Sequence, residues 1–331
     1  MWAPARLGNP PVFRGTFRAP EIRAAAPAGR ASDTVYSVQP EIEGSVKPAP
    51  DANPSLLMDV TRQDIRRAVR TLDLAGRPVC LHSSLSSFGH VRGGAPTVVQ
   101  AFLEEGCTLI VPTFSSDFEI EPPPHLCFER NGWDYGVDSA THADPGRLYT
   151  PEASEIDQYM GAVPAAVVGW PGRVRGAHPL DSFTAVGARA AELASGQRPS
   201  DVYAPLDALA RAGGFVVLAG VGLERMTLIH LAEKEAGRTL FRRWAVGEGG
   251  ETVAVEVGGC SEGFARLESS LGSVARTLVV GQSNWRSFPA AEVLTRAAAA
   301  IRADPLVTHC GDAACARCND AAAGGPLLPR R

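Results

Sequence analysis

No run of apolar residues in this chain of 331 residues approaches the ~18 that a membrane-spanning helix needs. The N-terminus also lacks the short basic segment and apolar stretch of a secretory signal. We therefore expect a cytoplasmic protein with no membrane partner. In that compartment its seven cysteines are expected to be thiols or metal ligands rather than disulfides.

Three familiar catalytic signatures are missing as well. The chain contains no His-Glu-x-x-His, no Gly-x-x-x-x-Gly-Lys-Ser/Thr and no Gly-x-Gly-x-x-Gly. Their absence excludes most zincins, P-loop enzymes and dehydrogenases of the standard Rossmann type.

Positive charge is scarce in one part of the chain. Residues 101–160 hold twelve Asp and Glu against two Arg, whereas the net charge of the whole chain is −4. This segment disfavours nucleic acid as a partner and suits a cationic small molecule. The alternative is an acidic loop that is merely solvated.

The composition divides the chain into three parts. Residues 1–55 hold nine of the 26 prolines with no helical or strand period, which predicts a disordered leader. An alternative is that translation begins at Met58. Residues 56–303 form the predicted main domain, and residues 304–331 a Cys-rich tail that forms a small lobe.

Helix-like and strand-like patterns alternate in the main domain. Thr61 is a candidate N-cap with Asp64 three residues on, before an apolar helical stripe. Predicted strands follow at 79–81, 108–111, 183–186, 215–219, 253–257 and 277–280, and further predicted helices at 95–103, 160–168, 205–212 and 290–302, besides the one that carries His230. The alternation predicts an α/β fold, a layered mixed sheet flanked by helices. Residues 115–154 are too long for a simple connection and are predicted to be a functional loop.

The stretch from Gly220 to Glu233 is the most informative. It places Thr227, His230 and Glu233 at steps of three, so on a helix they share one face and the carboxylate can hold the imidazole. The motif follows a predicted strand, where open α/β sheets usually bind ligands. The alternative is a solvated pair on a surface helix.

A second candidate site lies between a predicted strand and the helix after it. Its residues are His82, Ser83, Ser84, Leu85, Phe88, Gly89, Arg92, Gly93 and Gly94. Backbone N–H groups at a helix N-terminus attract anions, and Arg92 adds charge, which suits the pyrophosphate of a cofactor such as coenzyme A. A tight turn would need the same glycines.

His178 stands before Pro179 in a Gly- and Pro-rich loop. A residue before proline is held extended, so the imidazole is fixed in place, as a general base requires. The alternative is a turn histidine in water.

The tail carries a cluster of metal-ligand types. His309, Cys310, Cys315 and Cys318 could complete a tetrahedral structural zinc site. An iron–sulfur site of the plant type would need a fourth downstream Cys, which the tail does not contain. Free or oxidised thiols remain the alternative.

Eight short motifs carry a family resemblance. They are His82-Ser83-Ser84-Leu85, Gly93-Gly94, Pro112-Thr113-Phe114, Gly161-Ala162, Ala177-His178-Pro179 with Ser182, Tyr203-Ala204-Pro205-Leu206, Gly220 to Glu233, and Arg243-Trp244. Their order is that of the antibiotic N-acetyltransferases typified by aminoglycoside 3-N-acetyltransferase. The chain resembles this family from about residue 58 to residue 301.

The resemblance implies an α/β fold distinct from the GNAT acetyltransferases, with acetyl-CoA as donor and an amino group as acceptor. The cofactor would contact the region from His82 to Gly94, with Thr113 beside it. The acceptor would meet His178, Thr227, His230 and Glu233, and the acidic loop. In and near that loop, Asp117, Glu119, Asp157 and Ser182 are the candidate substrate residues.

From these assignments we expect direct attack of a neutral amine on the thioester, because no activated Ser or Cys is evident. His178 would be the general base, Glu233 would orient a histidine, and Thr227 or a backbone N–H near Ser83 would stabilise the tetrahedral oxygen.

Alternatives are a catalytically inactive ligand-binding or regulatory homologue and a transferase acting on an amine intermediate of secondary metabolism. A zinc-dependent amide hydrolase ranks last. A homodimer is left open.

Overall fold

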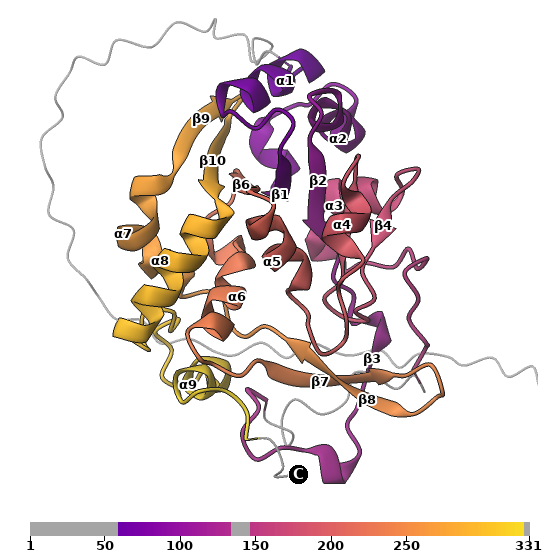
Figure 1. Cartoon of the computed structure of the whole chain (residues 1–331), viewed down its shortest axis with the longest axis vertical. Coiled ribbons are helices and arrows are strands. Elements are labelled where there is room, and N and C mark those ends of the chain that lie inside the picture. The colour runs from indigo at the N-terminus through magenta and orange to yellow at the C-terminus, as the bar shows by residue number, and fades with distance from the viewer. Residues whose placement is uncertain (1–58, 134–145, 328–331) are drawn as a thin grey trace, which may run out of the picture. The chain divides into compact units, whose positions relative to one another are not determined.

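The main sheet has seven strands in the order β4-β5-β2-β1-β6-β10-β9 (Figure 1). Its central strands β2, β1 and β6 are parallel, and every other pairing is antiparallel. The strands are β1 (Pro78–Ser83), β2 (Thr108–Pro112), β4 (Val174–Arg175), β5 (Phe183–Val186), β6 (Phe215–Ala219), β9 (Arg276–Val280) and β10 (Ser283–Pro289). The predicted mixed sheet is confirmed.

The computed structural model describes residues 59–133 and 146–327, all within one unit of contacts that spans residues 53–331. The predicted leader at 1–55 lies outside the described residues, as do residues 134–145 of the acidic segment. In the described ranges, no helix is long and apolar enough to cross a bilayer.

Helices cover both faces of the sheet (Figure 1). They are α1 (Arg62–Thr71), α2 (Gly94–Glu104), α3 (Ala162–Val168), α4 (Ala190–Ala194), α5 (Ala204–Arg211), α6 (Leu228–Glu235), α7 (Glu268–Leu271), α8 (Ala290–Ala303) and α9 (Ala316–Ala322). Helices α1 to α3 pack in one core, whereas α4 to α8 pack in the other. Alternate residues of β6 enter the two cores, Val216 and Leu218 on one side and Val217 and Ala219 on the other. This is the period of two that a strand buried on both faces must have.

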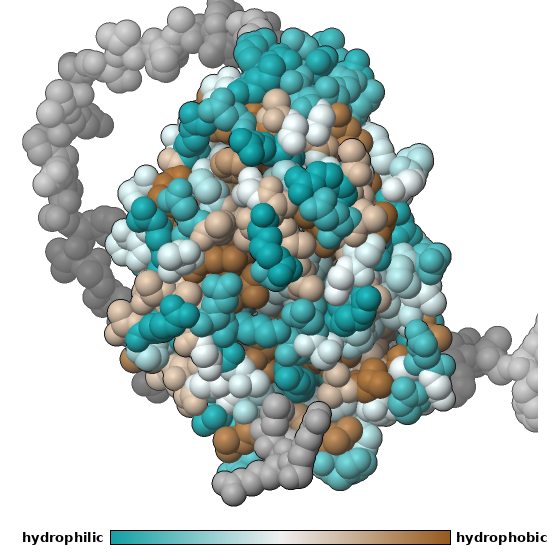
Figure 2. All heavy atoms as spheres, in the orientation of Figure 1, coloured by the Kyte–Doolittle hydropathy of each residue, from teal (hydrophilic) through white to brown (hydrophobic). Residues whose placement is uncertain are grey.

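The first helix begins as its sequence predicts. The side chain of Thr61 accepts a hydrogen bond from the Asp64 N–H at 3.3 Å, and the Asp64 carboxylate accepts one from the Thr61 N–H at 3.0 Å. Arg66 and Arg70 form ion pairs with Glu105, the C-cap residue of α2, at 2.7 and 2.6 Å. Figure 2 shows a hydrophilic surface over α1 and α2.

A second, antiparallel sheet contains β3 (Glu119–Ile120), β7 (Phe241–Val246) and β8 (Thr252–Val257) in the order β3-β7-β8. It has a small core of its own, which includes Phe118, Tyr149 and Val255. Strand β8 leads directly into Gly258, so this sheet positions a loop that the candidate site uses.

The structure differs from the sequence prediction at several elements. Residues 160–168 were predicted as one helix, but a 3-10 turn at Gln158–Met160 and α3 are separated at Gly161, whose φ of 87° breaks the helix. Strands β7 and β10 were not predicted, nor were the two-residue strands β3 and β4. Neither β7 nor β10 alternates polar and apolar residues strictly, and in both Arg, Ser and Asn outnumber the β-branched residues that mark strands.

Candidate active site

A pocket of about 780 Å³ opens at the carboxyl ends of the parallel strands. Residues that follow β1, β2 and β6 line it, among them Ser84, Phe114 and Val221. Loops before β5 and after β8 supply Asp181 and Gly258. The volume lies within the ~300–1,000 Å³ typical of sites for small ligands, and the position is where parallel strands usually place one.

His230 on α6 lines this pocket, and Glu233 on the same helix binds its imidazole. The Nδ1 of His230 lies 2.8 Å from Oε2 of Glu233, so Nδ1–H donates to the carboxylate. The ring stacks on Tyr203 and meets the edge of Phe264, with centroid distances of 6.0 and 4.8 Å. Within the described residues Nε2 has no hydrogen-bond partner, so that nitrogen is available to a ligand.

Glu233 is itself buried and fully engaged. Its Oε1 forms an ion pair with Arg238 and accepts a hydrogen bond from Thr308 at 3.1 Å, and Arg238 also donates to Thr308 at 2.8 Å. Arg238 is buried as well. A carboxylate held by a cation, a hydroxyl and an imidazole has one orientation, which fixes the imidazole in turn.

Asp181 is a second titratable group of the pocket wall, three residues after His178. Burial raises the pKa of its carboxyl to about 7, against the opposing effects of nearby His230 and the Gly258 N–H. A carboxyl with a pKa near neutrality in a pocket is a candidate for binding or proton transfer.

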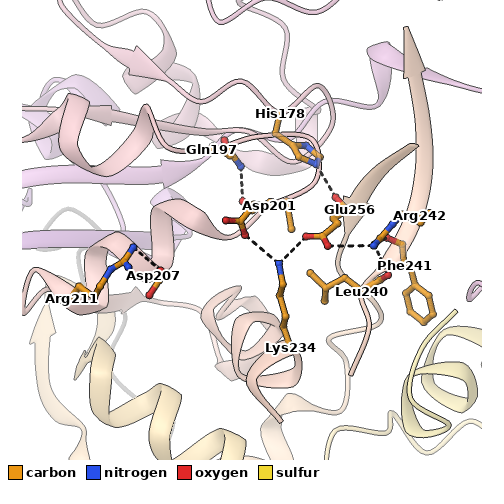
Figure 3. A network of polar contacts seen from close by, with 11 residues as sticks. His178, Gln197, Asp201, Asp207, Arg211, Lys234, Leu240, Phe241, Arg242 and Glu256 are labelled. Atoms are coloured by element: carbon orange, nitrogen blue, oxygen red, sulfur yellow. Dashed lines mark hydrogen bonds and ion pairs between the residues drawn. The ribbon is translucent and has the colours of Figure 1, made fainter. Parts of the chain in front are cut away.

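His178 does not lie in the pocket, and this changes its predicted role. It is completely buried, and its Nε2 donates to the backbone oxygen of Glu256 at 2.8 Å (Figure 3). Its Nδ1 accepts a hydrogen bond from the Asp181 N–H at 2.8 Å. Lys234 and Arg242 bind the carboxylate of the same Glu256. With both ring nitrogens occupied, His178 fixes the loop that carries Asp181 and is not placed to take a proton from a ligand.

Burial lowers the pKa of His178 to about 3, so only its neutral form fits this site. In the unfolded chain a histidine has a pKa of about 6.5, so between about pH 6.5 and 3 it binds a proton in the unfolded state but not in the folded state. The free energy of unfolding should therefore fall by ~1.4 kcal/mol per pH unit from this residue as the pH drops from about 6 to 4.

Urea unfolding across that pH range checks this, with His178→Gln beside the wild type. The variant should lose this part of the acid slope, whereas the exposed His125→Gln should keep it. Parallel slopes for the wild type and His178→Gln would contradict the assignment.

Thr113 and Ser182 are also buried outside the pocket lining. Thr113 Oγ1 lies 2.8 Å from the Thr184 hydroxyl, and Ser182 Oγ donates to the Thr113 backbone oxygen at 2.9 Å. Arg175 binds both residues, at 2.9 Å from Ser182 Oγ and 2.7 Å from Thr113 O. These predicted ligand residues instead join the ends of β2 and β5.

The predicted coenzyme region divides in two. His82, Ser83, Ser84 and Leu85 line the pocket. Phe88, Gly89, Arg92, Gly93 and Gly94 lie outside its lining: Phe88 is packed on Trp285, Arg92 pairs with Asp59 at 3.3 Å, and the Gly94 N–H donates to Val91.

The groups of the His82–Leu85 segment differ in whether they can bind a ligand. Burial lowers the pKa of His82 to about 4, so this imidazole is neutral. The buried Ser83 hydroxyl has no partner among the described residues, which leaves it a donor for a ligand. The N–H of Ser84 already donates to Ala219 at 3.0 Å and is not available to an oxyanion.

Charges of both signs meet at the pocket. Of the predicted acceptor residues, Glu119 and Asp157 line it, whereas Asp117 is exposed and lies 3.8 Å from Arg147. Thr227, at the start of α6, lines the pocket too. Lining residues that were not predicted as site residues include Asp181, Tyr203, Glu224, Arg225, Arg243 and Arg317.

The Cys-rich tail is also assembled differently from the prediction. The sulfur atoms of Cys260, Cys310, Cys315 and Cys318 lie within 4.8 Å of one another, and His309 is not part of the group. His309 Nδ1 accepts from the Gly311 N–H and its Nε2 lies 3.0 Å from Asn319 Oδ1. The sequence prediction took His309 as the fourth ligand, and no local pattern pointed to Cys260, which lies fifty residues before the tail cysteines.

Comparisons with known proteins agree with this architecture. The family described as aminoglycoside 3-N-acetyltransferase matches residues 80–302. Aminoglycoside N(3)-acetyltransferase IX of Micromonospora chalcea is 35% identical over 181 residues, which are 53% of this chain and 62% of that protein. The chain thus spans about three fifths of the length of this curated relative.

Solved structures of aminoglycoside acetyltransferases match a larger share of the chain. Aminoglycoside acetyltransferase AAC(3)-Xa is 30% identical, with a TM-score of 0.60 over 74% of this chain and 93% of that one. The apoenzyme of AAC(3)-IVa has 23% identity and a TM-score of 0.64 over 82% of this chain and 99% of its own, a likeness of fold. The family match covers most of the chain and includes the strands and α6 helix that build the pocket, so this protein belongs to the aminoglycoside 3-N-acetyltransferase family.

Proposed function

We propose that this protein is an acetyl-CoA-dependent N-acetyltransferase that acts on an amino group of an aminoglycoside-like molecule. The observation that carries the proposal is the buried Glu233–His230 pair, which presents a free imidazole nitrogen to a pocket whose lining includes several carboxylates. The family membership supports the reaction type. Two solved relatives of this fold, AAC-IIIb with CoASH and a variant of AAC(3)-IVa with a gentamicin, are complexes with the two kinds of ligand.

In this proposal His230 takes over the role first given to His178. The acceptor ammonium first loses one proton to solvent. As the neutral amine nitrogen attacks the acetyl carbonyl carbon, Nε2 of His230 accepts a second proton from that nitrogen. The imidazolium then donates this proton to the sulfur as the carbon–sulfur bond breaks, so that coenzyme A leaves as the thiol. Glu233 keeps Nδ1 protonated and stabilises the imidazolium, because its carboxylate lies 2.8 Å away.

The charges of the pocket suit both substrates. Asp181, with Glu119 and Asp157, would bind the ammonium groups of the acceptor, and Asp181 is close enough to His230 for the two charges to interact. The Ser83 hydroxyl would donate to the pantetheine or to the thioester. Thr227 lines the pocket on the same helix as His230 and is the proposed donor to the tetrahedral oxygen.

The direct experiment mixes the full chain with acetyl-CoA and a panel of amines. The panel holds aminoglycosides such as gentamicin and apramycin, linear polyamines and uncharged amines, and the readouts are free thiol and product mass. We expect thiol release that requires the acceptor, fastest with the aminoglycosides. Release only with weakly charged amines would favour a biosynthetic acceptor, and no release with any amine would support the ligand-binding alternative.

Gly258 gives a sharper test of the site. A Cβ at this position would lie 2.4 Å from the Tyr203 hydroxyl and 2.8 Å from Cδ2 of His230, closer than real contacts allow. Gly258→Ala should displace the imidazole and lower kcat/KM by ~100-fold, the scale of a misplaced catalytic group. Gly196→Ala is the matched control, because a Cβ there meets nothing within 4 Å. Equal losses in both variants, or none in either, would count against the geometry.

A further inference from the structure

Four cysteine side chains from two distant parts of the chain converge beside the pocket. Cys260 follows β8, and Cys310, Cys315 and Cys318 come from the C-terminal tail. All four sulfur atoms lie within 4.8 Å of one another. In a tetrahedral site with Zn–S bonds of ~2.3 Å the sulfur atoms are about 3.8 Å apart, so a small contraction would let one ion bind all four.

The loop after β8 packs closely against the C-terminal tail near the cysteine cluster. Gly263 packs on the tail so tightly that a Cβ would lie 2.3 Å from the Thr308 oxygen and 2.5 Å from the His309 carbonyl carbon. The Cys310 N–H donates to Sγ of Cys318 at 3.3 Å. Hydrogen bonds from backbone N–H groups to sulfur are the outer contacts that orient and stabilise thiolate ligands.

We infer that Cys260, Cys310, Cys315 and Cys318 form a structural zinc site. Four thiolates at one point favour zinc among the common protein metals, and a complete set of protein ligands leaves no position for a substrate. His309, whose two ring nitrogens have other partners, is excluded from the ligand set.

The site would also hold one wall of the pocket. Gly259 and Ser261 flank Cys260, and Arg317 lies between Cys315 and Cys318; all three line the pocket. A metal that joins the loop after β8 to the tail therefore fixes the position of Gly258 against His230. Zinc binding itself does not depend on the proposed reaction.

The first test measures the metal content of the full chain, purified without chelator, by mass spectrometry of the elements. We expect about one zinc per chain for the wild type, as a site with four protein ligands retains its metal. Cys260→Ser should lose more affinity than the ~10–100-fold that outer contacts contribute, and should be purified nearly metal-free. Cys127→Ser and His309→Ala are the matched controls and should keep full occupancy, because neither residue belongs to the cluster.

Cobalt replacement gives a readout that does not depend on how the variants fold. Wild-type protein exchanged with Co²⁺ should show the strong near-ultraviolet absorption of thiolate-to-cobalt charge transfer and the visible bands of a tetrahedral ion. Wild-type protein free of metal that takes up no cobalt would overturn the inference. So would iron in place of zinc, disulfides among the four cysteines, or a His309→Ala variant that loses its zinc.

Discussion

Replacing His230 with alanine should lower kcat by ~10²–10⁴, the range over which enzymes lose rate when a general base is removed. Acetyl-CoA binding should change little, since the imidazole faces the acceptor in the proposed mechanism. The measurement is the steady-state rate of thiol release at saturating acetyl-CoA and aminoglycoside, with the affinity for coenzyme A measured separately.

Two further variants show whether the loss is specific. His125→Ala removes an exposed imidazole and should leave the rate unchanged. Glu233→Gln keeps a hydrogen-bond acceptor for Nδ1 but removes the charge that stabilises the imidazolium, so its rate should fall between the wild type and His230→Ala. A His230→Ala enzyme with near-normal turnover would remove this residue from the mechanism.

A second large effect is expected when the ion pair between Arg238 and Glu233 is broken. Arg238→Met should lower the free energy of unfolding by ~3–5 kcal/mol, because it leaves the buried Glu233 carboxylate without its cation. Arg238 also donates to Thr308 and to the Pro305 oxygen, so the variant would loosen the tail as well. Urea unfolding at neutral pH measures the loss.

Arg211→Met is the matched control for this prediction. Arg211 pairs with Asp207 at 2.7 Å, but the two side chains are 73% and 42% exposed. Exposed pairs contribute about 1 kcal/mol or less, so this variant should unfold almost like the wild type. If both variants lose the same stability, the buried Arg238–Glu233 pair contributes no more to folding than the exposed Arg211–Asp207 pair.

Much of the fold could be predicted because its signals are local. The Thr61 cap, the strands at 183–186 and 215–219, and helix α8 depend on neighbouring residues or on a period that the sequence displays directly. The contact between His230 and Glu233 was predicted for the same reason, since helix geometry places residues three apart on one face.

The rest of the site depends on contacts between distant segments. Whether His178 faced the pocket or the interior was decided by Glu256, 78 residues away, which holds its Nε2. Cys260 joins the tail cysteines only because β8 ends beside them. Asp181 looked like an ordinary loop carboxyl, and only burial in the folded chain raises its pKa to about 7.

The central claim is that this pocket brings an amine to His230 beside a thioester. A crystal structure of the full chain with coenzyme A and an aminoglycoside tests it most directly. We predict the reactive amine within hydrogen-bonding distance of His230 Nε2, with the cofactor thiol next to it and the Ser83–Leu85 segment along the pantetheine. An acceptor bound elsewhere, with no ligand at His230, would contradict the account.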